Sequence, residues 1–191
     1  MRQRIAQEAA RIMAEEGICD YFMAKRKAAD RLGAADTQNM PRNTEVEEAL
    51  HEYQRLFKSA TQPRRLRELR ETALRAMQLL VQFNPRLVGA VASGTAGEHS
   101  DVSLHLFANS PEEVVLFLME KRIPHEPAER RLRLSNDAAA VFPVYRFLAG
   151  DTVIDLTVFP VDGVRQAPRS PVDGRPMQRV SIGALQELIA E

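Results

Sequence analysis

The chain has little cysteine, no net charge and no long apolar run, and each shortage narrows the class of protein. Its single cysteine, Cys19, cannot form an internal disulfide, and no Cys/His cluster indicates structural zinc. The 26 Lys and Arg residues balance the 26 Asp and Glu residues, so the total charge does not steer the protein to a polyanion. No apolar run reaches the ~18 residues of a membrane span, and the N-terminus lacks the apolar core of a secretory signal. We therefore expect a cytoplasmic protein with no membrane partner.

Three common ligand-binding motifs are also missing. The chain has no Walker A loop, no GxGxxG turn and no G-x-S-x-G nucleophile motif. Its 191 residues and 45% hydrophobic content are nevertheless enough for a packed core. Cys19 follows Ile18 at an expected helix boundary, so we predict that it is a small, buried or half-buried side chain.

The first third of the chain has the periodicity of helices. Apolar residues recur at helical spacing near the N-terminus, and Gly17 is a suitable stop. Asp20 is a candidate cap for a second helix, and Thr44 with Glu47 forms a capping-box pattern for a third. We expect an N-terminal helical region over residues 1–62, and a long amphipathic helix that begins after Pro63.

The remainder alternates between strand and helix patterns. Expected strands lie near 87–91, 102–106, 131–134, 141–148 and 152–159, with a helix at 111–121 that Ser110 caps. Gly150-Asp151 predicts a tight hairpin turn. A proline-rich segment, 160–180, precedes a short last helix after Ser181. The fold class is therefore α+β: a helical N-terminal region, then a mixed-sheet domain over residues 63–191 that is flanked by helices and has a proline-rich C-terminal wrap.

One stretch, GAVASGTAGEHSDVSLHL over residues 89–106, carries a recognisable pattern. It resembles the signature of the nucleotidyltransferase superfamily (the DNA polymerase beta-like or minimal nucleotidyltransferase group). In that signature a strand ends in Gly-Ser, a glycine-containing turn follows, and the next strand carries Asp-x-Asp. Gly89 matches the motif glycine, whereas Ala90 stands where the serine would be. The resemblance implies a nucleotide-binding set of Gly89, Ser93, Gly94, Ser100 and Ser103.

The carboxylates of the signature are only partly present. The resemblance implies catalytic roles for Asp101, the first carboxylate, and Asp155, the third, whereas Ser103 stands where the second would be. In the family these carboxylates hold two divalent metals for nucleotidyl transfer, and a serine hydroxyl is a poor substitute for one. Strand alternation places His105 on the same face, so Asp101, His105 and Asp155 are a candidate set of ligands for Mg²⁺ or Mn²⁺.

Three functional hypotheses follow. In the leading one, the protein is nucleotidyltransferase-like with reduced or lost catalysis, and it binds a nucleoside triphosphate, a protein partner or a second copy of itself. In the second, it is an active metal-dependent nucleotidyltransferase that acts on a small molecule, a protein or RNA. In the third, it binds RNA or DNA through basic helix residues. The basic residues in question are Lys25, Arg26, Lys27 and Arg31.

A basic segment near the expected cleft has two interpretations. Arg130, Arg131 and Arg133 lie on a strand-like stretch. They hold a triphosphate in one interpretation, and in the other they pair with Glu126 and Glu129.

Overall fold

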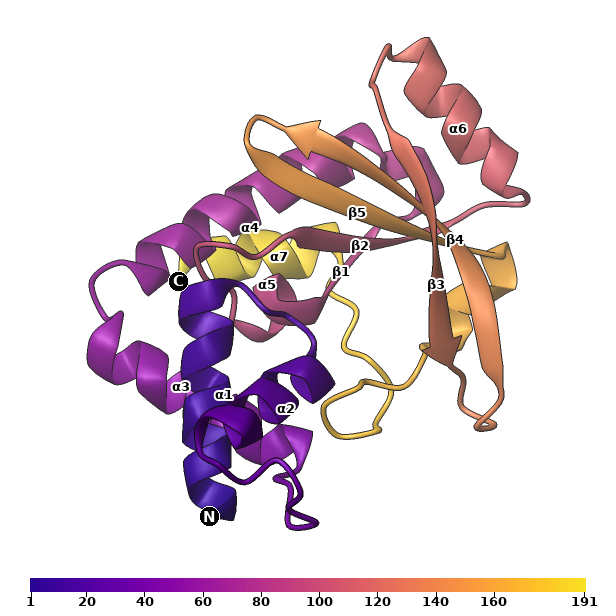
Figure 1. Ribbon diagram of the computed structural model, residues 1–191. Helices are drawn as coiled ribbons and strands as arrows, with labels where there is room; N and C mark the ends of the chain where they lie inside the picture. The colour runs from indigo at the N-terminus through magenta and orange to yellow at the C-terminus, as the bar shows by residue number, and fades with distance from the viewer. The chain divides into compact units, whose positions relative to one another are not determined.

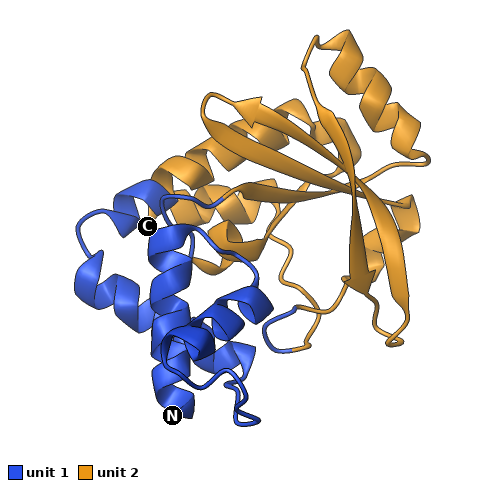
Figure 2. Cartoon of the chain, viewed as in Figure 1, with its two compact units in different colours: residues 1–66, 95–100, 171–173 blue, residues 67–94, 101–170, 174–191 orange.

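The computed structural model describes all residues, 1–191, as two compact units of helices and a five-stranded sheet (Figure 1). The α+β prediction is therefore confirmed. The first unit comprises residues 1–66, 95–100 and 171–173, and the second comprises residues 67–94, 101–170 and 174–191 (Figure 2). Whereas the sequence placed a boundary between 62 and 63, the contacts divide the chain between Leu66 and Arg67 and assign two later segments to the first unit.

The first unit is a small helical assembly. It contains α1 (Arg2–Glu16), α2 (Tyr21–Arg31), α3 (Asn43–Phe57) and the beginning of α4 (Gln62–Leu79). Its core is rich in alanine, which allows α1, α2 and α3 to pack closely. Fully buried members include Ile5, Ala9, Ile12, Ala24, Ala28 and Val46.

The helix ends were predicted with mixed success. Gly17 ends α1 at φ +71°, and the Asp20 side chain accepts a hydrogen bond from the Met23 amide at 2.8 Å, as expected. The predicted Thr44–Glu47 capping box is wrong. The N-cap is Arg42, two residues before Thr44, so helix α3 begins at Asn43, and the Glu45 side chain accepts a hydrogen bond from the Arg42 amide.

The environment of Cys19 also differs from the prediction. We expected a buried or half-buried thiol, but Cys19 is exposed, and its Sγ lies 3.6 Å from the Gly17 carbonyl oxygen. Cys19 sits in the short connection between α1 and α2, where the chain turns outside the helical core. A single apolar-like residue at a helix boundary therefore says little about burial.

The second unit is built on a sheet with strand order β1-β2-β5-β4-β3. β2 and β5 are parallel, and every other neighbouring pair is antiparallel. The strands are β1 (Arg86–Val88), β2 (Val102–Phe107), β3 (Glu126–Arg133), β4 (Ala139–Ala149) and β5 (Thr152–Phe159). The other elements are η1 (Val81–Phe83), α5 (Gly89–Ser93), α6 (Pro111–Glu120), η2 (Val161–Arg165) and α7 (Ile182–Ala190).

One predicted strand is shorter than expected. The apolar run 87–91 predicts a strand, but pairing stops at Val88, and residues 89–93 form the helical turn α5. Gly89 permits the change of direction because it adopts φ +75°, a conformation that L side chains rarely adopt. As a result the motif glycine sits directly after β1.

The two faces of the sheet differ in character. One face carries fully buried aliphatic side chains, including Leu104, Leu106, Ile154 and Leu156. The other face carries most of the polar and charged residues of β2, β4 and β5, because alternate residues of a strand point to opposite faces. The register places Ser103 opposite Asp155, His105 opposite Thr157, and Arg146 opposite Asp155. We call this the polar face of the sheet.

Candidate functional site

Asp155 is at the centre of the polar face, and both of its carboxylate oxygens are occupied. Arg130 donates from Nη1 to Oδ1 at 2.6 Å and from Nη2 to Oδ2 at 2.9 Å. Arg146 donates from Nε to Oδ2 at 2.9 Å. The Asp155 side chain is only 4% exposed, so the two guanidinium groups replace water as its partners. We call Arg130, Asp155 and Arg146 the Arg–Asp–Arg cluster.

The electrostatics of Asp155 follow from this arrangement. Burial alone would raise its pKa, but the hydrogen bonds and charges of Arg130 and Arg146 outweigh burial and lower the pKa below its ordinary value. In turn, the hydrogen bond to Asp155 raises the pKa of Arg130. Asp155 is therefore a carboxylate at neutral pH, with its charge compensated inside the protein.

Asp101 lies at the edge of the same cluster. Its pKa is raised, first by partial burial and then by the negative charge of Asp155, and the charges of Arg146 and Arg130 counteract this only in part. Ser103 follows two residues later on β2 and faces Asp155 across the parallel pair. Asp101, Ser103 and Asp155 therefore come together as the motif implies, although the two arginines were not anticipated in this place.

His105 is on the same face but belongs to a second group of contacts. Its side chain is 2% exposed, and its Nδ1 accepts a hydrogen bond from Arg179 Nε at 3.0 Å. Burial, together with the charges of Arg179 and Arg130, lowers the pKa of His105 to about 3. The ring also lies 4.5 Å from that of Phe159. His105 is thus a neutral, packed acceptor.

Arg179 belongs to the proline-rich segment and is held over the sheet. Its guanidinium carbon lies 4.9 Å from the ring centroids of both Phe107 and Phe159. Nη1 donates to the Gly163 carbonyl at 2.8 Å, whereas Nη2 has no hydrogen-bond partner in the protein. Burial and the nearby charge of Arg86 lower the pKa of Arg179 to about 10, so it remains a cation at neutral pH.

These contacts do not fit the predicted metal site of Asp101, His105 and Asp155. No group of three His, Cys, Asp or Glu side chains in the chain is arranged to hold a metal ion. Asp155 has both oxygens engaged by arginines, and the His105 Nδ1 lone pair is directed at Arg179. A divalent cation needs free carboxylate oxygens and would here meet two guanidinium groups. We derive no metal-dependent step from this site.

The glycine and serine residues of the motif are divided between the two units. Gly89 lies against Ser103: a Cβ added to Gly89 would be 3.8 Å from the Ser103 Cβ and Oγ, an ordinary contact. Ser93 is the last residue of α5, and Gly94 caps that helix at φ +93°. Ser100 belongs to the first unit, where its Oγ accepts a hydrogen bond from the Gly97 amide at 2.9 Å. Ser103 is therefore the motif residue that is paired with Asp155 across the strands, and Gly89 adjoins Ser103.

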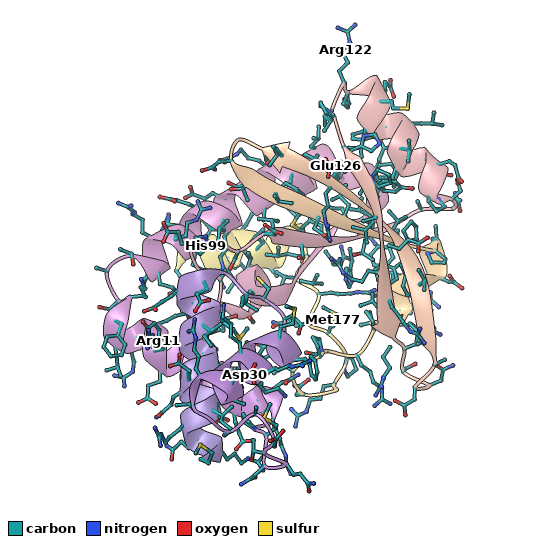
Figure 3. The ribbon with its side chains drawn as sticks, in the orientation of Figure 1. Arg11, Asp30, His99, Arg122, Glu126 and Met177 are labelled. Atoms are coloured by element: carbon teal, nitrogen blue, oxygen red, sulfur yellow. The ribbon has the colours of Figure 1, made fainter.

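Two of the contacts were missed or left open by sequence reasoning. The pairing of Arg130 with Glu126 or Glu129 is not found, since Arg130 bonds Asp155 and Thr157. Glu126, labelled in Figure 3, begins β3 and sits opposite Arg146. Arg146 was not considered, although the two-residue turn at Gly150-Asp151 sets a hairpin register in which Arg146 and Asp155 are equally far from the turn.

No family model, curated protein or solved structure matches this chain. The resemblance to nucleotidyltransferases therefore stays a prediction that rests on residues 89–106 and Asp155. No helix of the chain is long and apolar enough to cross a membrane.

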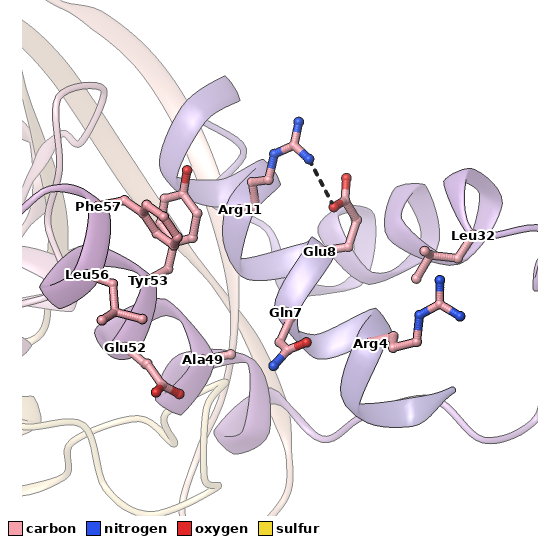
Figure 4. A pocket seen from close by; sticks show the side chains of 10 residues that line it. All are labelled: Arg4, Gln7, Glu8, Arg11, Leu32, Ala49, Glu52, Tyr53, Leu56 and Phe57. Atoms are coloured by element: carbon pink, nitrogen blue, oxygen red, sulfur yellow. Dashed lines mark ion pairs between the residues drawn. The ribbon is translucent and has the colours of Figure 1, made fainter.

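The first unit contains a groove of about 490 Å³ that includes none of the predicted site residues. It runs between α1 and α3, and Figure 4 shows Tyr53, Leu56 and Phe57 on one side, with Arg4 and Leu32 towards the other. Its charges are partly paired internally, because Glu8 contacts Arg11 at 3.5 Å and Arg31 at 3.2 Å. The groove mixes apolar and charged walls without a dominant ligand chemistry.

Proposed function

We propose that the second unit is a nucleotidyltransferase-like module that binds a nucleotide through its phosphate groups and has lost nucleotidyl transfer. The observation that carries the proposal is the Arg–Asp–Arg cluster. In the implied mechanism Asp155 would be a metal ligand, but here it accepts three hydrogen bonds from two arginines. Guanidinium groups recognise phosphate oxygens through paired N–H donors, so the same place on the sheet favours an anion.

Further residues of the polar face support binding over transfer. Ser103 replaces a carboxylate and Ala90 replaces a hydroxyl, which removes two groups that the resemblance implies for catalysis. Gly89, next to Ser103, leaves the backbone without a side chain at this point. A nucleotide can therefore approach the main chain closely, as phosphate-binding turns require.

The nucleic-acid hypothesis receives less support from the contacts of α2. Lys27 contacts Glu16 at 2.5 Å, and Arg31 contacts Glu16 at 2.7 Å and Glu8 at 3.2 Å. Lys25 donates to the Pro41 carbonyl at 3.1 Å. Three of the four basic side chains are thus engaged within the first unit, and a phosphate backbone would have to displace those partners.

The test compares binding with chemistry in the same preparation. Each nucleoside triphosphate is titrated into the full chain by calorimetry, and pyrophosphate release is followed with Mg²⁺ or Mn²⁺. We expect binding of at least one nucleotide without pyrophosphate release. Metal-dependent release that disappears in Asp101→Asn would instead establish an active transferase, and failure of every nucleotide to bind would refute the proposal.

A further inference from the structure

The polar face carries a row of guanidinium groups that extends beyond the Arg–Asp–Arg cluster. Arg130 comes from β3 and Arg146 from β4. Arg179 is hydrogen-bonded to His105 of β2, and the nearby charge of Arg86 helps to lower the pKa of Arg179. Arg86 sits opposite His105 in the β1–β2 pair. Four cations therefore follow one another across the strands, with Asp101 and Asp155 as the acids beside them.

The two arginines of the cluster differ in how many N–H donors remain free for a ligand. Arg130 uses Nη1 and Nη2 for Asp155 and Thr157, and its side chain is 32% exposed. Arg146 uses only Nε, its side chain is 47% exposed, and its Nη1 and Nη2 groups donate to no protein atom. Arg130 is thus the group that compensates Asp155, and Arg146 is the group with donors left for a ligand.

We infer that the polar face binds a polyphosphate chain without a divalent cation, and that Arg146 is its principal contact. The inference rests on the proposed function and adds to it that the ligand binds as the free anion, without a bound metal ion. A row of separated guanidinium groups suits an extended polyanion better than a single phosphate. With Asp155 already neutralised by arginines, Asp101 is the one carboxylate left beside them, and no group of three ligands for a metal ion is present, so the metal-free triphosphate is the complementary species.

The test titrates ATP and inorganic tripolyphosphate into the full chain, once in EDTA and once in excess Mg²⁺. We expect ATP to bind in EDTA at least as tightly as in Mg²⁺, and both ligands to bind more weakly as salt rises. Arg146→Gln should weaken binding about tenfold or more, because the free donors are removed while Arg130 still holds Asp155. Arg131→Gln is the matched control: it removes the same charge from the adjacent, exposed residue on the opposite face of β3.

The outcomes separate the inference from the proposed function. ATP binding that requires Mg²⁺ would overturn the inference and leave the nucleotide-binding proposal intact. Binding of tripolyphosphate without binding of any nucleotide would support the inference and refute the proposed function. Absence of binding by both ligands would overturn the inference, and the proposed function would fall with it if no other nucleotide binds. Equal losses in Arg146→Gln and Arg131→Gln would reject Arg146 as the contact.

Discussion

At the scale of single residues, Asp155 determines how the site is interpreted. From the sequence it is a lone acid between Ile154 and Leu156, which fits both a metal ligand and a structural ion pair. The structure gives it two arginine partners and almost complete burial. Such an ion pair is costly to break from one side, because the remaining charge stays buried without compensation.

Loss of Arg130 should therefore destabilise the protein. Arg130→Gln removes two of the three hydrogen bonds to Asp155 and leaves Arg146, which is more exposed, as its only cationic partner. We expect the free energy of unfolding to fall by about 2–3 kcal/mol, measured by urea denaturation at neutral pH. Arg131→Gln should change it by less than about 0.5 kcal/mol. A neutral result for Arg130→Gln would mean that water reaches Asp155.

His105 should make stability depend on pH. Its folded pKa is about 3, below the value of 6.5 that applies in the unfolded chain, so the unfolded state binds the extra proton between these limits. Stability should therefore fall as pH drops from about 6 to about 4, by at most about 1.4 kcal/mol per pH unit from this group. Urea denaturation across this range should show a shallower slope for His105→Gln, which does not titrate. Parallel slopes would show that His105 is hydrated.

How much of the site was predictable also depends on individual residues. Strand alternation predicts that Asp101, Ser103 and Asp155 share a face, and the structure pairs Ser103 with Asp155 and puts Asp101 near enough to Asp155 for their charges to interact. His105 was on the expected face, but its acceptor role depends on Arg179, which lies 74 residues away in an irregular segment. Local periodicity carries no information about such a contact. Arg146 was predictable in principle, from the register of its hairpin.

At the scale of elements, helices and long strands followed from periodicity, whereas their ends did not. Strands β3 and β4 are longer than their apolar stretches, because exposed residues such as Glu129 continue the backbone pairing. The start of α3 was misjudged because its N-cap is Arg42, a residue type that is not among the usual caps, so the pattern favoured Thr44. Main-chain pairing and capping depend on geometry that the hydrophobic pattern does not encode.

Two helix-terminal glycines of the first unit allow backbone strain to be separated from packing. Gly17 and Gly33 have similar positive φ values, +71° and +66°, but a Cβ on Gly17 would lie 2.8 Å from the Cβ of His99, whereas Gly33 has open space. Gly33→Ala should cost about 1 kcal/mol from the left-handed conformation alone. Gly17→Ala should cost about 1–2 kcal/mol more, because His99 must move. Thermal denaturation of both variants measures the difference, and equal losses would contradict the close contact.

At the scale of the whole molecule, the two units are not consecutive in sequence. Residues 95–100 belong with the N-terminal helices, so the chain leaves the second unit between α5 and β2 and then returns to it. In the first unit, the buried Gln54 side chain donates to the Thr95 carbonyl at 2.7 Å, and Gln62 donates to the Ala96 carbonyl at 2.8 Å. Residues 95–100 are thus hydrogen-bonded to α3 and α4 through main-chain carbonyl groups. A single boundary between residues 62 and 63 did not predict that later segments of the chain belong to the first unit.

The Arg–Asp–Arg cluster has a consequence for how the chain folds. All three residues lie within the antiparallel meander of β3, β4 and β5, whereas β2 must join β5 in parallel from far away in sequence. Local antiparallel pairing closes shorter loops and is kinetically accessible earlier. A slip of one residue in the meander would move Asp155 to the face opposite the arginines and bury it without a partner. The charges of the Arg–Asp–Arg cluster would then also select the correct strand register before the parallel strand arrives.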